Sequence, residues 1–128
     1  MERQSKYGTK HIYPIEPVAK PRMTRRDKWL TPPRPAVQKY RWFCDLVRAY
    51  QVDLPLDGAI VTFKIAMPAS WSKKKKAEMD GQPHRQVPDW DNLGKALSDA
   101  VYGQDCGIAD IRIIKKWAKT GAIEIEEK

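Results

Sequence analysis

The sequence predicts a mixed α/β fold of the α+β kind, a small mixed sheet with helices packed on one face. Residues 59–67 alternate as in a strand, residues 35–50 and 91–101 carry apolar side chains at helical spacing, and no internal repeat is present. A chain of 128 residues fits one compact domain. We therefore expect a single domain over residues 1–128, with residues 1–10 as a flexible tail.

The N-terminal half is expected to hold one short strand and one long helix. Residues 11–15 alternate weakly and predict a strand that stops at Pro17. Residues 20–29 are basic and interrupted by proline, which predicts a loop. Pro35 is a favoured first-turn residue. After it the spacing predicts an amphipathic helix ending before Pro55, with apolar positions at Val37, Tyr40, Phe43, Cys44, Val47 and Tyr50.

The C-terminal half alternates strands with helices. Residues 59–67 form the clearest predicted strand, and the serines at the start of residues 70–79 are expected to cap a short helix with an exposed lysine run. Residues 80–85 read as a loop. A helix over residues 91–101 would bury one face, and strands are expected at 108–117 and 122–125 with a turn at Thr120-Gly121.

The net charge of +8 is concentrated at the N-terminal end. Residues 1–50 carry 12 lysines and arginines against 4 acidic residues, whereas residues 87–128 carry 6 against 8. A basic surface favours nucleic acid, because each phosphate that it neutralises releases counterions. Plain solubility is the alternative explanation of such a charge.

Cysteine and histidine are too few to favour a zinc site. Cys44 and Cys106 lie in unrelated contexts, so both thiols are expected to be reduced and structural. With only His11 and His84 besides, the chain offers too few ligands for a zinc site. Residues 1–11 do not read as a secretory signal, and no run approaches the roughly 18 apolar residues of a spanning helix. We expect a cytoplasmic protein.

Three carboxylates and a lysine gather in one short stretch, which reads Pro88-Asp89-Trp90-Asp91-Asn92-Leu93-Gly94-Lys95 and is followed by Asp105. Helix capping explains one of these aspartates. It explains neither the second nor Asp105, although Asp91 and Lys95 at i, i+4 could form a surface salt bridge worth less than about 1 kcal/mol. Clustered carboxylates suggest a hard cation, and we expect Mg²⁺.

Chain geometry permits the third carboxylate to join the other two. A helix over residues 91–101 rises about 15 Å, and the four residues up to Asp105 can return about 13 Å. Asp105 can therefore come near Asp91, although this geometry does not require it to do so.

These residues resemble the RusA-like Holliday junction resolvases. The family signature, Pro-Asp-x-Asp-Asn-Leu-x-Lys, then Asp-Ala, then Asp-Asp-x-Gln-Ile, is similar to residues 88–95, to Asp99-Ala100 and to residues 104–108. Lys20-Pro21-Arg22 is similar to another family element, so the resemblance covers residues 12–117. It implies a RusA-like fold, a homodimer, and a Mg²⁺-dependent endodeoxyribonuclease that resolves Holliday junctions by paired nicks in DNA recombination and repair.

Carried over residue by residue, the resemblance implies that Asp89, Asp91 and Asp105 are catalytic and bind the metal, and that Lys95 is the catalytic lysine. The chain departs from the signature at Gln104 and Gly107, which replace an aspartate and a glutamine. Asp110 competes as the third carboxylate. Its alternation with Ile111 fits a strand residue beyond the motif, so Asp105 is preferred.

Ten basic residues are candidates for contacting the DNA backbone, and each has solvated surface as its alternative. They are Lys20, Arg22, Arg25, Arg26, Lys28, Lys73, Lys74, Lys75, Lys76 and Arg85. Trp29 and Trp71 stand beside lysines and could stack on splayed bases, although packing is the commoner fate of tryptophan. His84 is a lone loop histidine, a type that usually has no catalytic role.

The expected partner is four-way junction DNA, with no membrane and no small-molecule cofactor beyond the metal. The cell of origin would be bacterial, or a host infected by a phage. Two alternatives stay open: a nuclease for flaps or other branched DNA, and a non-catalytic basic DNA-binding module in which Gln104 and Gly107 mark lost catalysis.

Overall fold

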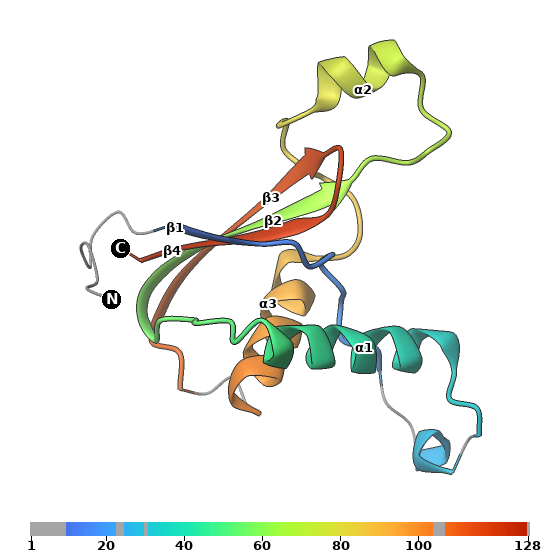
Figure 1. Ribbon diagram of the computed structural model, residues 1–128, viewed down its shortest axis with the longest axis vertical. Helices are drawn as coiled ribbons and strands as arrows, with labels where there is room; N and C mark the ends of the chain where they lie inside the picture. Colours follow the sequence, from blue (N-terminus) through green and yellow to red (C-terminus); the bar gives the residue numbers. More distant parts are fainter. Residues whose placement is uncertain (1–9, 23–24, 30, 104–106, 128) are drawn as a thin grey trace.

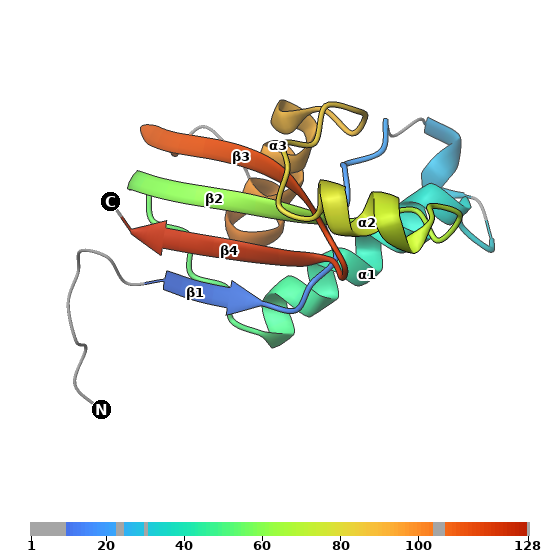
Figure 2. The ribbon, with the colours of Figure 1, turned by 90° about the horizontal axis from the view of Figure 1, so that it is seen from above.

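The computed structural model describes residues 10–22, 25–29, 31–103 and 107–127, so the expected tail lies almost wholly outside it. Four strands, β1 (Lys10–Tyr13), β2 (Asp57–Ala66), β3 (Asp110–Ala118) and β4 (Ala122–Glu127), form one sheet in the order β1-β4-β2-β3. β4 runs antiparallel to both neighbours, whereas β2 and β3 are parallel (Figure 2). The predicted small mixed sheet is confirmed.

The last two strands are consecutive in sequence but do not pair. β2 lies between β3 and β4, so the connection at Thr120-Gly121 crosses the end of β2 and does not form a hairpin (Figure 2). The crossing is tight at Gly121, where an added Cβ would lie 2.9 Å from Cγ and 3.0 Å from Cα of Glu16. A glycine permits this approach.

Helices α1 (Pro35–Ala49) and α3 (Trp90–Tyr102) cover the same face of the sheet, as predicted (Figure 1). Helix α2 (Lys73–Met79) stands apart, beyond the ends of β2 and β3 (Figure 1). Its predicted serine cap is present, because Ser72 Oγ accepts the N–H of Lys75 at 3.1 Å. The expected loop at residues 20–29 contains a short 3₁₀ helix, η1 (Arg25–Lys28), which its polar sequence did not indicate.

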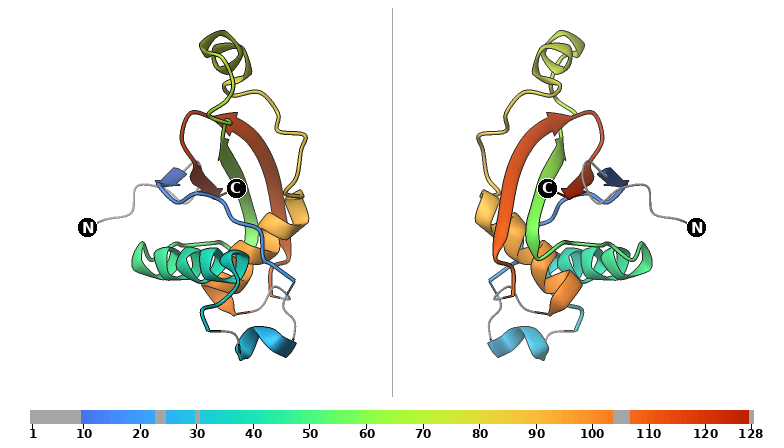
Figure 3. Two further views of the ribbon diagram at one scale, coloured as in Figure 1. Left: turned by 90° about the vertical axis from the view of Figure 1, so that its right-hand side faces the viewer. Right: turned by 90° about the vertical axis from the view of Figure 1, so that its left-hand side faces the viewer.

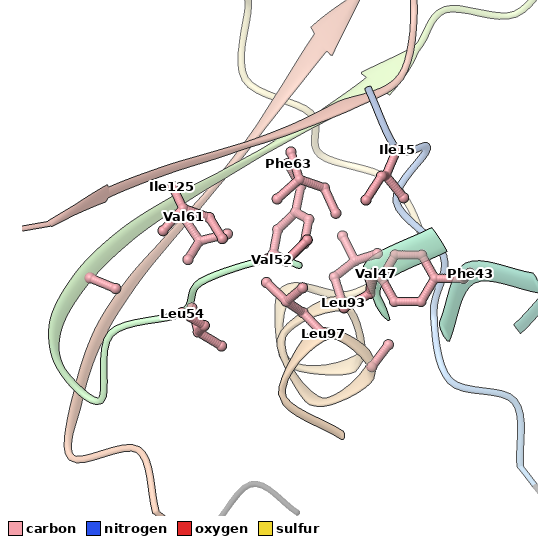
Figure 4. Packing of buried hydrophobic residues seen from close by; sticks show 13 residues of the cluster. Ile15, Phe43, Val47, Val52, Leu54, Val61, Phe63, Leu93, Leu97 and Ile125 are labelled. Carbon is pink, nitrogen blue, oxygen red and sulfur yellow. The ribbon is translucent and has the colours of Figure 1, made fainter. Parts of the chain in front are cut away.

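The core lies between the sheet and its two covering helices (Figure 4). Val61 and Phe63 of β2 meet Leu93 and Leu97 of α3, and all four side chains are at most 1% exposed. Cys44 of α1 packs at the edge of this core as a free thiol, and Cys106 lies outside the described residues. The core thus fixes the buried face of α3 and, with it, the direction of the opposite face.

Every helix in the described part of the chain is too short or too polar to cross a bilayer.

Candidate active site

Asp89 occupies the N-cap position of α3, but its side chain does not cap the helix. The backbone there is extended, with φ −71° and ψ 153°, and the Asp89 carbonyl accepts the N–H of Leu93 at 3.1 Å. A capping aspartate would accept a first-turn N–H with its carboxylate. No such hydrogen bond is present among the described residues of α3, so capping does not explain Asp89.

The two sides of α3 have separate roles. Leu93, Ala96 and Leu97 face the core, whereas Asp91 and Lys95 follow one another by a helical turn on another side. That second side borders a groove of about 270 Å³ against β3 and the segment before it. The residues that line the groove are Trp90, Asp91, Gly94, Lys95, Ser98, Ile108, Ile111 and Ile113.

Gly94 lies where α3 faces β3. A Cβ added at Gly94 would lie 2.7 Å from Cδ1 of Ile113, closer than two carbon atoms pack without movement. Glycine weakens a helix by about 1 kcal/mol relative to alanine. An alanine at this position would require the end of the Ile113 side chain to move, whereas glycine leaves the groove next to Asp91 without a side chain at this point.

The two motif carboxylates and the motif lysine have no side-chain partner within the part of the chain that the structure describes. Among the described residues, neither Asp89 nor Asp91 accepts a side-chain hydrogen bond, and Lys95 does not pair with Asp91. The surface salt bridge that the i, i+4 spacing allowed is therefore not formed. Asp91 is partly buried, while Asp89 and Lys95 are exposed. Their charges remain available to a ligand.

Of the two candidates for the third carboxylate, Asp105 and Asp110, the structure describes only Asp110. Asp105 lies outside the described residues, three positions before Ile108, which lines the groove. Asp110 begins β3 and is exposed, and strand alternation directs it to the face opposite Ile111, away from the groove. No cluster of three metal-ligating side chains occurs within the described part of the chain.

The segment between α2 and α3 is contacted by Lys115 of β3, a residue that the sequence analysis did not single out. Lys115 Nζ donates to the backbone carbonyls of Gln86 at 2.6 Å and Pro88 at 2.7 Å, directly before Asp89. Trp90 and Ser98 were likewise missed. Ser98 lies seven residues after Asp91, so the helical period alone could have placed it on the groove side. Trp90 is 62% exposed beside the motif carboxylates.

His84, the loop histidine that precedes the motif, is buried against Trp117. Its ring is 4% exposed and lies 4.2 Å from the ring of Trp117, and within the described residues its buried Nδ1 has no hydrogen-bond partner. Burial first, and then the positive charge of Lys115, lower the pKa of His84 below its ordinary value. A neutral imidazole is therefore favoured at this position.

The lysine run forms the outer part of α2. Lys73, Lys74 and Lys75 are exposed, and the Nζ of Lys75 lies 4.2 Å from the centre of the Trp71 ring, as in a cation–π pair. Trp71 packs at 4.8 Å against Trp117, so packing accounts for it and base stacking is not needed. Arg85 is exposed on the segment that leads from α2 to the motif.

The N-terminal basic residues lie at the other end of the molecule. Figure 3 shows α2 and η1 at opposite ends of the long axis, with the start of α3 between them. Arg25, Arg26, Lys28 and Trp29 of this region are exposed. Lys20 differs from them, because its Nζ lies 2.5 Å from Asp99 Oδ2 on α3.

The sequence of the chain also matches a family of known proteins. The family model described as endodeoxyribonuclease RusA matches residues 14–127, nearly the whole chain. A search of curated proteins found no match.

Proposed function

The chain belongs to the RusA endodeoxyribonuclease family, and from this membership we propose that it resolves Holliday junctions by paired, Mg²⁺-dependent nicks during DNA recombination and repair. As a member of that family it is an endodeoxyribonuclease, a hydrolase of phosphodiester bonds. One observation supports the site assignment above all others. Asp91 and Lys95 line a groove from the first turns of α3, Asp89 is the N-cap residue directly before them, and none of the three has a side-chain partner among the described residues.

The donor set suits a hard cation. Carboxylates supply oxygen ligands, which Mg²⁺ prefers. Within the described residues, the carboxylate oxygens of Asp89 and Asp91 form neither a helix cap nor an ion pair. We assign Asp89 and Asp91 to the metal, with Asp105 as the third carboxylate. A bound Mg²⁺ would polarise the phosphate and lower the pKa of a water molecule.

Lys95 has a separate task in this proposal. It borders the groove one turn after Asp91, so its ammonium group can lie against the scissile phosphate. A positioned cation offsets the charge that develops on a phosphate oxygen during hydrolysis, and it does so without reorganising. The product would carry a 5′-phosphate, as expected when the bond to the leaving 3′-oxygen breaks.

The two basic regions suit a long, charged ligand that passes the site. Helix α2 and the region of η1 lie on opposite sides of the start of α3 along the molecule's long axis (Figure 3). We propose that they contact DNA arms flanking the scissile phosphate, without reading sequence. The residues assigned to this role are Arg22, Arg25, Arg26, Lys28, Lys73, Lys74, Lys75, Lys76 and Arg85.

Two active sites are needed to resolve one junction, because gap-free resolution takes two coordinated nicks. A twofold homodimer supplies them symmetrically. We propose this assembly, acting on four-way junction DNA in the cytoplasm of a bacterial cell or a phage-infected host, with no membrane partner and no cofactor besides the metal.

The decisive experiment replaces Asp91 by Asn and assays a synthetic four-way junction in Mg²⁺. Cutting should fall by at least about a hundredfold while junction binding in EDTA persists, because the change removes a metal ligand and leaves the basic regions intact. Asp45→Asn is the matched control, since Asp45 is exposed on α1 and pairs with Arg48. Unchanged cutting by the Asp91 variant would refute the metal site.

The same assay identifies the third carboxylate. Asp105→Asn should behave like Asp91→Asn, whereas Asp110→Asn should leave cutting nearly intact, because Asp110 lies on the sheet face turned away from the groove. The opposite ranking would assign the ligand to Asp110.

Substrate comparison separates the remaining alternatives. A junction resolvase should cut the four-way junction in preference to a flap, a fork or a linear duplex. Equal or faster cutting of flaps would support the nuclease for other branched DNA, and tight binding without cutting in Mg²⁺ would support the non-catalytic module.

A further inference from the structure

The segment before the catalytic motif is attached to β3 by backbone hydrogen bonds. Gly81 N donates to the Trp117 carbonyl and Trp117 N to the Gln82 carbonyl, both at 2.9 Å, and His84 N donates to the Lys115 carbonyl at 3.0 Å. Pro83 and Lys116 form a bridge within the same antiparallel run. The outer edge of β3 is thus covered at residues 115–117, and the chain continues from there toward the start of α3.

Beyond His84 this backbone pairing stops, and the Lys115 side chain takes over. Its Nζ donates to the carbonyl of Gln86 at 2.6 Å and to the carbonyl of Pro88 at 2.7 Å. Pro88 has no N–H, so the segment cannot continue a regular ladder at this point. The Pro88 carbonyl belongs to the peptide group that joins Pro88 to Asp89, so Lys115 holds the peptide next to the first motif carboxylate.

We propose that Lys115 is a positioning residue that fixes residues 86–88 and thereby holds the Asp89 and Asp91 carboxylates in their metal-binding arrangement. The inference rests on the proposed metal site, but it assigns a role outside the family signature. Lys115 reaches the motif from β3, while Asp89 and Asp91 follow the segment that it holds. Its charge strengthens both hydrogen bonds, because an ammonium donor is a stronger donor than a neutral one.

Lys116 supplies the matched control. It is the next residue in the same strand, carries the same charge, and is exposed on the opposite face of the sheet. Replacing either lysine by methionine removes one positive charge and leaves a side chain of similar length. Only the change at Lys115 removes the two hydrogen bonds to the motif segment.

The first measurement is binding of Mn²⁺ alone to the DNA-free protein, followed by electron paramagnetic resonance or calorimetry. Lys115→Met should weaken Mn²⁺ binding by about tenfold, the lower end of the loss seen when an outer partner of a metal ligand is removed. Lys115→Arg keeps a cationic donor and should stay within about threefold of the wild type, and Lys116→Met should leave binding unchanged. Thermal melts identify variants that are not folded.

Junction binding in EDTA and cutting across a Mg²⁺ titration form the second measurement. For Lys115→Met we expect a tenfold higher Mg²⁺ concentration at half-maximal cutting, with junction affinity within about twofold of the wild type. If Lys115→Met does not fold, Lys115→Gln replaces it. Its Mn²⁺ affinity should be lower than that of the wild type and of Lys115→Arg, but above background.

Equal Mn²⁺ affinity in the folded Lys115 variants and the wild type would overturn the proposal. Weaker junction binding in EDTA with Mn²⁺ affinity preserved would also overturn it, and would make Lys115 a phosphate contact. If Asp91→Asn itself binds Mn²⁺ like the wild type, the proposed metal site fails. If Asp91→Asn loses Mn²⁺ and Lys115→Met does not, the positioning role alone fails.

Discussion

The ion pair between Lys20 and Asp99 allows a test of what the basic N-terminal segment contributes. The Lys20 Nζ lies 2.5 Å from Asp99 Oδ2, and the two side chains are 42% and 18% exposed. Asp99 projects from α3, so the pair connects the segment before η1 to the helix that carries the motif. We predict that Lys20 stabilises this connection and does not contact DNA phosphate.

The magnitude follows from the exposure of the pair. Fully exposed pairs are worth about 0.2–1 kcal/mol. This pair is partly buried but still screened by water, so we expect a coupling energy near the upper end of that range, about 1 kcal/mol. For a chain of this size, 1 kcal/mol corresponds to a change in melting temperature of about 3–4 °C. The stabilisation should decrease in 1 M salt, because exposed charges are screened there.

The assay is a double-mutant cycle with Lys20→Met, Asp99→Asn and the double variant, measured by urea unfolding. Each single change should lower the free energy of unfolding by about 1 kcal/mol, and the double change by less than the sum. Junction affinity is then measured against salt concentration. Lys20→Met should leave the slope unchanged, whereas Arg25→Met should reduce it by about one counterion.

A different pair of results would refute this reasoning. Zero coupling in the cycle, together with a reduced salt slope for Lys20→Met, would mean that Lys20 leaves Asp99 to contact phosphate. The N-terminal sequence Lys20-Pro21-Arg22 would then act as one DNA-binding unit.

Three further changes have defined outcomes. Because burial lowers the pKa of folded His84 below 6.5, the unfolded state binds more protons as pH falls through that value, and stability is lost. His84→Gln should therefore flatten the fall in unfolding free energy below pH 6.5, by up to about 1.4 kcal/mol per pH unit, in denaturant titrations at several pH values. Ser72→Ala removes the cap of α2 and should speed amide exchange there several-fold, with the melting temperature nearly unchanged because no α2 residue is buried. Asp89→Ser should abolish cutting yet change the unfolding free energy by less than about 1 kcal/mol, because serine is as good an N-cap as aspartate; calorimetry showing a larger loss of stability would contradict this.

Local patterns predicted the elements well because their causes are local. The helical spacing of Leu93, Ala96 and Leu97 places one buried face on α3, and all three are buried. The serine cap of α2 formed for the same reason, since its partner lies three residues away. The 3₁₀ helix η1 was missed because the polar residues 25–28 have no apolar period to reveal it.

Strand order could not be derived in the same way. A short connection between β3 and β4 usually joins paired strands, yet β2 lies between them. The reason is burial across the sheet: Val61 and Phe63 of β2 pair with Ile125 and Ile123 of β4, and all four are core residues. Such non-local pairing depends on which faces meet in the folded chain, so neighbouring sequence does not show it.

The motif itself was readable because Asp89, Asp91 and Lys95 come from one turn-and-helix segment, whose spacing fixes their relation. The contact of Lys115 with the motif segment could not be predicted from the sequence. Lys115 lies 26 residues after Asp89, among other lysines, and only the parallel pairing of β3 with β2 and the covered edge of β3 bring it to the motif. Sequence thus indicates the groups that would carry out the chemistry, while the residues that hold them follow from topology.

Two interactions that would stabilise the start of α3 are not made, and this supports a functional role for its aspartates more strongly than their charge alone. A capping carboxylate at Asp89 would add about 1 kcal/mol to the helix, and an Asp91–Lys95 pair a few tenths more. Neither interaction is made within the described residues. The positive end of the helix still favours ionised carboxylates near its first turn. Within the described residues, both carboxylates therefore lack the partners that capping and ion pairing would give them, which is the observation that supports the proposed cation site.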